Sequence, residues 1–332
     1  MVSIKFDNVY INDFESIVGK EEIKGNLTNI KNVIKDFYNG EKTFETSQIS
    51  MESLVIDNLF KKNNYINQDV DLIIGGDLSN QLSGTNYAAS KFNNSFLGIY
   101  SACSSFIEGL IVSSNMLSIE NIKRVINITG SHNLASERAF RYPVEYGVLR
   151  NVNSTFTITG AVGCILSHKK SYLKITDATI GSPISLGIKD TNMIGAIMAP
   201  AAAETIINHL NNFNRKIDYY DLILTGDLGN VGLNILKDYL YEEFNIKTNN
   251  IIDAGSNIYK ELSEVNDGAS GPSVLPLYFF YNVLNKKKYR KILLVGTGSL
   301  HSKTLVNQKL DVPAISHAVS VEVKRWALFI HF

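Results

Sequence analysis

An internal repeat constrains the fold of this 332-residue chain more than any other feature. The stretch DLIIGGDLSN at residues 71–80 returns as DLILTGDLGN at residues 221–230, with seven of ten positions identical. Each copy has the pattern of a short buried strand that ends in a Gly-Asp turn and follows an amphipathic helical run. In the second of these runs, Pro200 suits the first turn of a helix. The repeat therefore predicts two related halves.

The similarity continues downstream of both copies. Residues 104–132 and 270–301 each run through a small-residue turn, a helix, a basic connector and an apolar strand that ends near a histidine. An apolar hairpin-like segment then closes each half, at 155–167 and 314–323. Alternating helices and strands of this kind predict an α/β fold with mixed sheets, of about five strands in each half, covered by helices. We expect an N-terminal half at 1–168 and a C-terminal half at 169–332.

Composition excludes several classes of protein. Lys plus Arg and Asp plus Glu both total 32, so the chain is neutral and no broad surface for nucleic acid is expected. The basic run at 286–291 is interpreted as a solvated helix end. Two cysteines, Cys103 and Cys164, make neither a metal-site spacing nor a disulfide framework. We recognise no signal peptide and no transmembrane stretch of about 18–20 apolar residues.

Four strings carry a resemblance to a known family. GGDLSNQLSGTNYAA, SACSSFIEG, GSHNLASERAFRYPVEYG and MAPAAAETI with YDLILTGDLG closely resemble the stage V sporulation protein AD family of endospore formers. The resemblance implies a thiolase-like fold that binds dipicolinic acid, or its calcium chelate, without catalysis, during uptake into the developing spore and release at germination. It also implies integral membrane partner proteins, a homodimer, and a peripheral position on the cytoplasmic side of the forespore or spore inner membrane.

Cys103 lies where an apolar strand pattern meets a helical one, in YSACSSF. In thiolase-type enzymes the nucleophilic cysteine occupies such a helix N-terminus, where backbone N–H groups favour the thiolate. Acyl transfer also needs a base and an oxyanion site. At the places where the resemblance puts these groups, this chain has Gly226 and Asp227, then Gly268 with Asn266 nearby. The catalytic set is incomplete, so we interpret Cys103 as a vestigial nucleophile position that lines a ligand pocket.

A planar dicarboxylate needs charged and hydrogen-bonding donors across a flat slot. The segment GSHNLASERAFRYPVEYG follows the predicted strand RVINIT, and open α/β sheets place ligands at the carboxyl ends of strands. Arginine and aromatic side chains suit an anionic aromatic ligand by charge pairing and stacking. The expected ligand-binding residues are Cys103, Ser131, His132, Asn133, Arg138, Arg141, Tyr142 and His301.

Alternatives stay open for several of these features. Arg138 and Arg141 equally suit ion pairs across a loop or a dimer interface, and Cys103 also suits an acyl-transferring enzyme. The string GTGSLHS at 296–302 is expected to form a tight turn that lines the pocket. A third hypothesis is a scaffold protein whose surface matters only for docking partners.

The remaining histidines and the aspartates received separate interpretations. His317, like His301, can lie near Cys103 if the halves pack around a pseudo-twofold axis. Surface or packing roles are expected for the histidines that lack reactive neighbours in the sequence, namely His168, His209 and His331. We expect no cofactor and no metal held by the protein, because Asp77 and Asp227 are too few for a calcium cage. Any calcium would be held largely by oxygens of the ligand.

Overall fold

The computed structural model of this chain describes residues 1–140, 153–259 and 267–324. Within them, a ten-stranded mixed sheet has the strand order β3-β2-β4-β6-β1-β7-β12-β11-β8-β9. The strands of this sheet are β1 (Val2–Val18), β2 (Leu72–Asp77), β3 (Ser95–Gly98), β4 (Arg124–Ser131), β6 (Gly160–Ser167), β7 (Leu173–Ile180), β8 (Leu222–Thr225), β9 (Ile251–Asp253), β11 (Lys291–Ser299) and β12 (Ala314–Val323). A small second sheet pairs β5 (Phe156–Thr157) with β10 (Ala269–Ser270) in parallel.

The strand order contains two equivalent sets. In the first half, β2 lies between the parallel strands β3 and β4, and antiparallel β6 leads to β1. In the second half, β8 lies between the parallel strands β9 and β11, and antiparallel β12 leads to β7. The predicted α/β fold with mixed sheets is confirmed. The boundary at residue 168 stays a prediction, and it falls in the connection between β6 and β7.

The two sets of strands are joined into one sheet through β1. Its residues Tyr10–Val18 pair with β6, and its earlier residues pair with β7. The register shifts between Ile11 and Asp13 and again between Lys5 and Val9. Such bulges bend and twist a strand, which lets one long strand serve two differently oriented neighbours.

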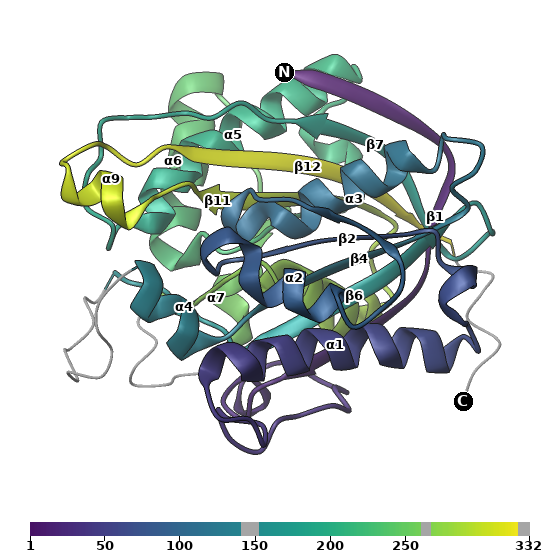
Figure 1. The fold of residues 1–332 in the computed structure, drawn as a ribbon. Coiled ribbons are helices and arrows are strands. Elements are labelled where there is room, and N and C mark those ends of the chain that lie inside the picture. Colours follow the sequence, from purple (N-terminus) through teal and green to yellow (C-terminus); the bar gives the residue numbers. More distant parts are fainter. Residues whose placement is uncertain (141–152, 260–266, 325–332) are drawn as a thin grey trace.

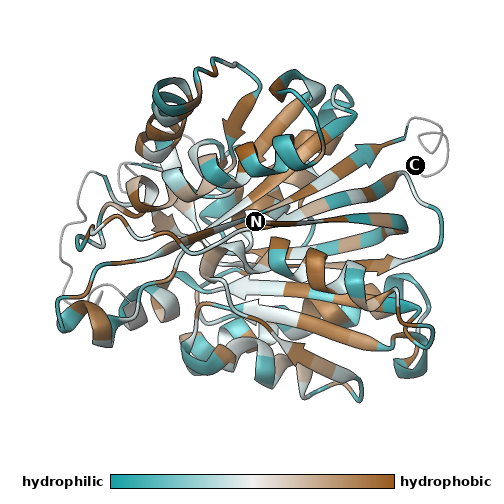
Figure 2. Ribbon diagram, turned by 90° about the horizontal axis from the view of Figure 1, so that it is seen from above, coloured by the Kyte–Doolittle hydropathy of each residue, from teal (hydrophilic) through white to brown (hydrophobic). Residues whose placement is uncertain are grey.

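Helices cover the sheet in layers (Figure 1). They are α1 (Phe44–Lys62), α2 (Ser83–Ala89), α3 (Ser105–Met116), α4 (Asn133–Phe140), α5 (Ile194–Asn212), α6 (Gly229–Phe244), α7 (Gly255–Ile258), α8 (Val274–Tyr278) and α9 (Lys303–Asn307). Helix α3 contacts strands of both halves, α1 and α2 pack on the first half, and α5 and α6 pack on the second. Hydrophobic residues concentrate along the strands and hydrophilic residues in the outer loops (Figure 2).

The helix positions follow from apolar spacing. Phe106 and Leu110 of α3 are four positions apart and both buried, as are Met51 and Val55 of α1. Residues at this spacing share one helix face, so each helix presents an apolar stripe to the sheet. Burying a side chain of this size stabilises the fold by about 1.5–3 kcal/mol.

Two local predictions are wrong. Pro200 lies inside α5, which begins at Ile194, because the buried apolar face extends the helix past the bond that proline cannot make. The segments at 155–167 and 314–323 are not hairpins. The first divides between β5 and β6, which join different sheets, and the second is the single strand β12.

Candidate functional site

A cavity of about 610 Å³ opens where β2 and β11 end. The turn after β2 forms one wall, the segment after β11 forms another, and the bend before α3 contributes Cys103. The lining residues are Leu78, Ser79, Asn80, Gln81, Leu82, Tyr100, Ala102, Cys103, Ile194, Ser270, Ser299, Leu300, His301, Ser302, Lys303, Thr304 and Asn307. Both halves of the chain therefore build this cavity.

Cys103 is partly exposed on a tight bend between β3 and α3. The preceding residue, Ala102, has a φ of +52°, a left-handed conformation that costs a non-glycine residue about 1 kcal/mol or more. The bend rests directly on β11, because a Cβ atom at Gly298 would lie 2.2 Å from the carbonyl oxygen of Ser101. The glycines of GTGSLHS thus serve close packing within a strand, whereas a tight turn was predicted, and Ser299 begins the cavity wall.

Asp227 follows β8 and is 1% exposed. Its carboxylate accepts hydrogen bonds from the Thr297 hydroxyl at 2.8 Å and from the Gly271 N–H at 3.1 Å, and the Cys103 thiol also bonds to it. Burial outweighs these hydrogen bonds and raises the pKa of Asp227 from 3.8 to about 7. The aspartate that the repeat singled out is therefore the direct neighbour of the candidate nucleophile.

A thiol beside a carboxylate differs chemically from a thiol beside an imidazole. An imidazolium stabilises a thiolate, whereas an ionised Asp227 opposes a second negative charge on the sulfur of Cys103. The thiol donates its proton to the carboxylate, so the pair holds the sulfur protonated at neutral pH. This arrangement suits hydrogen bonding to a ligand better than nucleophilic attack.

The second expected catalytic position is also occupied by a glycine. Gly268 has a φ of +123° and packs so closely on Gly255 that a Cβ atom would lie 2.7 Å from the Gly255 carbonyl oxygen. The backbone here favours glycine on both counts. Asn266, the nearby amide, lies outside the described residues.

The cavity wall after β11 carries basic side chains. Lys303 and His301 both line the cavity, and the Nδ1 atom of His301 lies 3.3 Å from the Ser299 hydroxyl oxygen. The described lining contains neither aspartate nor glutamate, and its other polar groups are hydroxyls, amides and the Cys103 thiol. A cavity with this charge suits an anion.

Two of the expected ligand-binding residues, Cys103 and His301, line this cavity. Four others make contacts elsewhere. Ser131 donates to the Ile158 carbonyl at 2.8 Å, and the Asn133 amide donates to the Thr157 carbonyl at 2.6 Å. Their predicted role in binding stays a prediction.

His132 and Arg138 lie against the start of α1. The Nε2 atom of His132 is 2.7 Å from the Phe37 carbonyl oxygen, and its ring stacks on Phe44 at 5.2 Å. Burial lowers the pKa of His132. Arg138 pairs with Glu45, as the ion-pair alternative anticipated. Neither side chain lines the cavity.

Three further predictions have different outcomes. Arg141 and Tyr142 lie outside the described residues. His317 lies in β12, does not line the cavity, and accepts the Gly181 N–H at 3.1 Å through Nδ1. Burial lowers the pKa of His317 to about 4, so this imidazole is neutral at pH 7.

Several cavity residues were missed by sequence reasoning. Gln81 and Leu82 follow the first Gly-Asp turn and both have positive φ, at 60° and 54°. Tyr100 and Lys303 also line the cavity. The signal for Gln81 and Leu82 was their position just after the repeat, while Lys303 resembles any exposed lysine until the fold is known.

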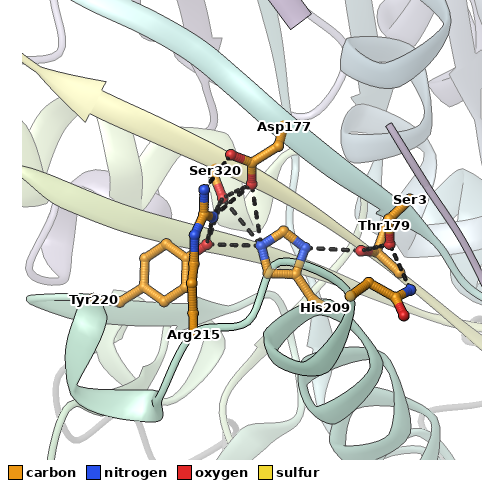
Figure 3. A network of polar contacts seen from close by, with 8 residues as sticks. Ser3, Asp177, Thr179, His209, Arg215, Tyr220 and Ser320 are labelled. Carbon is orange, nitrogen blue, oxygen red and sulfur yellow. Dashed lines mark hydrogen bonds and ion pairs between the residues drawn. The ribbon is translucent and has the colours of Figure 1, made fainter. Parts of the chain in front are cut away.

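A buried polar network lies apart from the cavity, in the second half (Figure 3). The guanidinium of Arg215 donates to both carboxylate oxygens of Asp177, at 2.8 and 2.7 Å. The Nε2 atom of His209 contacts Tyr220, Ser320 and Asp177 within 3.2 Å. His209 was expected to lack reactive neighbours, and that interpretation is wrong because its partners come from strands far away in the sequence.

Two searches of the described residues bear on other functions. No group of three or more histidine, cysteine, aspartate or glutamate side chains in this part of the chain is placed to hold a metal ion. Among the same residues, no helix combines the length and the apolar character needed to cross a membrane.

Sequence comparison identifies similar proteins over most of the chain. The protein-family model described as stage V sporulation protein AD matches residues 2–322. The stage V sporulation protein AD of Bacillus subtilis (strain 168) is 35% identical over 318 residues, which cover 95% of this chain and 94% of that protein.

Solved structures with a similar fold are much more distant in sequence. A 3-oxoacyl-(acyl carrier protein) synthase III from Xanthomonas oryzae aligns with a TM-score of 0.61 at 12% identity, over 96% of this chain and all (100%) of that one. The OleA protein of Xanthomonas campestris aligns with a TM-score of 0.60 at 13% identity, over 96% and 99%. At this identity the similarity shows the fold alone, and it confirms the expected thiolase-like architecture.

Proposed function

Because this chain belongs to the stage V sporulation protein AD family, we propose that it binds dipicolinic acid, free or as its calcium chelate, without catalysing a reaction. The ligand occupies the cavity beside Cys103. In this role the protein assists uptake of the acid into the developing spore and its release at germination, together with integral membrane proteins. It works as a homodimer on the cytoplasmic side of the spore inner membrane.

The observation that carries the proposal is the Cys103–Asp227 pair. A carboxylate in place of an imidazole leaves the thiol protonated, and it provides no imidazolium to return a proton during acyl transfer. The fold supplies the pocket of a thiolase-like protein, whereas the described site lacks the base that such chemistry needs.

The charge and shape of the cavity support an aromatic dianion as the ligand. Lys303 and His301 supply donors for carboxylates on one wall, and backbone and hydroxyl groups near Ser79 and Ser270 line the others. Tyr100 gives an aromatic surface for stacking at the same cavity. A volume of about 610 Å³ lies in the range of small-molecule pockets.

The proposed homodimer uses the edge of the sheet. Strand β3 is the terminal strand of the first half, and three of its four residues, Ser95, Leu97 and Gly98, are exposed. An unpaired strand edge is a ready template for a second chain. A dimer formed there would bring two copies of the bend at Cys103 close to one interface.

Isothermal titration calorimetry with dipicolinate and with calcium dipicolinate tests the ligand. We expect binding to wild-type protein and about tenfold weaker binding to Lys303→Gln, because one charge-assisted hydrogen bond is lost. Lys309→Gln is the matched control, since Lys309 is exposed in the same segment but does not line the cavity. No heat with either form of the ligand would remove the proposal.

One observation favours a second function, an acyl-transferring enzyme that uses Cys103. The cysteine is partly exposed in a pocket of the fold that a 3-oxoacyl synthase III shares. Incubation with an acyl-coenzyme A, followed by mass spectrometry of the Cys103 peptide, distinguishes the two. The binding function predicts no acylation and slow alkylation by iodoacetamide, with faster alkylation in Asp227→Asn because the opposing charge is gone.

A further inference from the structure

A cluster of lysines and tyrosines occupies the end of the sheet opposite the cavity. It combines the connection before β11, the connection between β6 and β7, and the residue that follows β12. We call this cluster the basic end; its members are Lys169, Lys170, Tyr172, Lys286, Lys287, Lys288, Tyr289, Arg290 and Lys324.

Backbone hydrogen bonds hold these segments side by side. The Arg290 carbonyl accepts the Val323 N–H at 2.8 Å, and the Tyr172 carbonyl accepts the Lys324 N–H at 2.8 Å. A shallow surface depression is lined by residues from all three segments, including Lys287. The basic end is therefore one continuous surface, although its members are spread over more than half of the sequence.

The positive charge of the basic end is not compensated within the described chain. None of its lysines, nor Arg290, forms an ion pair with a described residue. The carboxylates nearby are already engaged. Asp13 and Glu15 pair with Lys62 at 2.7 and 3.0 Å, and Asp221 accepts two backbone N–H groups at the entry of β11. Since the whole chain is neutral, this local excess of cations is a segregation of charge.

We propose that the basic end docks the protein on an anionic lipid bilayer. Lysine ammonium groups attract headgroups without requiring a fixed geometry, and each one near such a surface strengthens binding about fivefold. Tyrosine suits the headgroup level, and Lys288 already lies 5.3 Å from the ring centre of Tyr289. Protein interfaces instead enrich arginine and deplete lysine, and Arg290 is outnumbered here by lysines. The inference rests on the peripheral membrane position proposed above and identifies its surface.

Docking through the basic end fixes the orientation of the cavity. Strand β11 begins at the basic end with Lys291 and reaches the cavity at Ser299, and its nine residues span about 30 Å. Figure 1 shows the same separation, with α9 at one end of β12 and the strand running to the far side of the sheet. The cavity of a docked molecule therefore faces away from the lipid surface and stays open to solution.

Co-sedimentation with vesicles tests the proposal on the full chain. Vesicles of equal parts phosphatidylglycerol and phosphatidylcholine are compared with vesicles of phosphatidylcholine alone. We expect binding to the anionic vesicles, and about a hundredfold loss of affinity in the triple variant Lys286→Gln, Lys287→Gln and Lys288→Gln. The matched control is the triple variant Lys31→Gln, Lys35→Gln and Lys42→Gln, which removes exposed lysines from the segment before α1 and should change affinity less than about twofold.

Each outcome decides a different point. Failure of the wild-type protein to prefer anionic vesicles overturns lipid docking altogether. Equal losses in both triple variants would overturn the assignment of the surface while leaving the membrane position intact. Dipicolinate calorimetry on the basic-end variant should match wild type, so a failure of ligand binding is recognised separately. Binding that persists undiminished in molar salt contradicts the electrostatic attraction.

Discussion

Asp177 and Asp227 are both buried aspartates of the second half, yet they have opposite surroundings. Asp177 faces the guanidinium of Arg215 and the imidazole of His209, and these hydrogen bonds overcome the effect of burial and hold its pKa below the usual range. The described partners of Asp227 are a hydroxyl, a backbone N–H and a thiol, and burial raises its pKa to about 7. The first carboxylate stabilises the fold, whereas the second costs stability beside a cavity. That cost is typical of a functional position.

The largest expected effect separates the two aspartates by stability. Asp177→Ala leaves the Arg215 guanidinium buried without its partner, so we expect the free energy of unfolding to fall by about 3–5 kcal/mol. Urea denaturation measures the loss, with Asp238→Ala on the exposed side of α6 as the control at less than about 0.5 kcal/mol. A loss as small as that of the control would show that the network in Figure 3 contributes little.

The pH dependence of stability should have opposite signs at the two sites. Folding raises the pKa of Asp227 from 3.8 to about 7, so the native state keeps a proton that the unfolded chain has lost. Stability therefore falls as the pH rises through this window, by on the order of 3 kcal/mol, and Asp227→Asn should remove that fall. Asp177, with its lowered pKa, contributes stability above pH about 4 that is lost on acidification.

Urea denaturation of wild type and Asp227→Asn at several pH values measures the difference between them. The subtraction matters because other buried acids, such as Glu22 with a pKa raised to about 6, also contribute to the wild-type curve. Parallel curves for the two proteins would mean that Asp227 is ionised in the fold at all these pH values, and the comparison would collapse.

The smallest effect concerns the hydroxyl that supports Asp227. Thr297→Val deletes the donor at 2.8 Å from the carboxylate, which should lower stability by about 1–2 kcal/mol and raise the pKa of Asp227 further. The pH at which stability stops falling then moves upward. Thr205→Val removes a buried hydroxyl bonded to the Ser316 carbonyl, and it should lower stability without moving that pH.

The repeat made the fold predictable from the sequence. Apolar periodicity and the two Gly-Asp turns located β2 and β8, and the similarity downstream located α3 and β11. These features are local, because strand and helix patterns lie within a few consecutive residues. The bend at Cys103 was recognised for the same reason.

The composition of the site was much less predictable. Asp77 and Asp227 occupy equivalent repeat positions, but Asp77 accepts bonds from Ser79 and Thr85 in its own half. Asp227 instead reaches Cys103 in the other half. Identical sequence context gave two different roles because the packing of the halves decides which partner is near. The partners of His209 were hidden for the same reason.

Strand β1 has a consequence for synthesis of the chain. Its first residues pair with β7 and its last residues with β6, so the strand that leaves the ribosome first completes its hydrogen bonds only after Ile180 has followed. Until then it is an unpaired apolar edge, the kind of surface on which nascent chains aggregate. Folding of the first half is thus kinetically coupled to the arrival of the second, and slow translation before β7 should lower the yield of native protein.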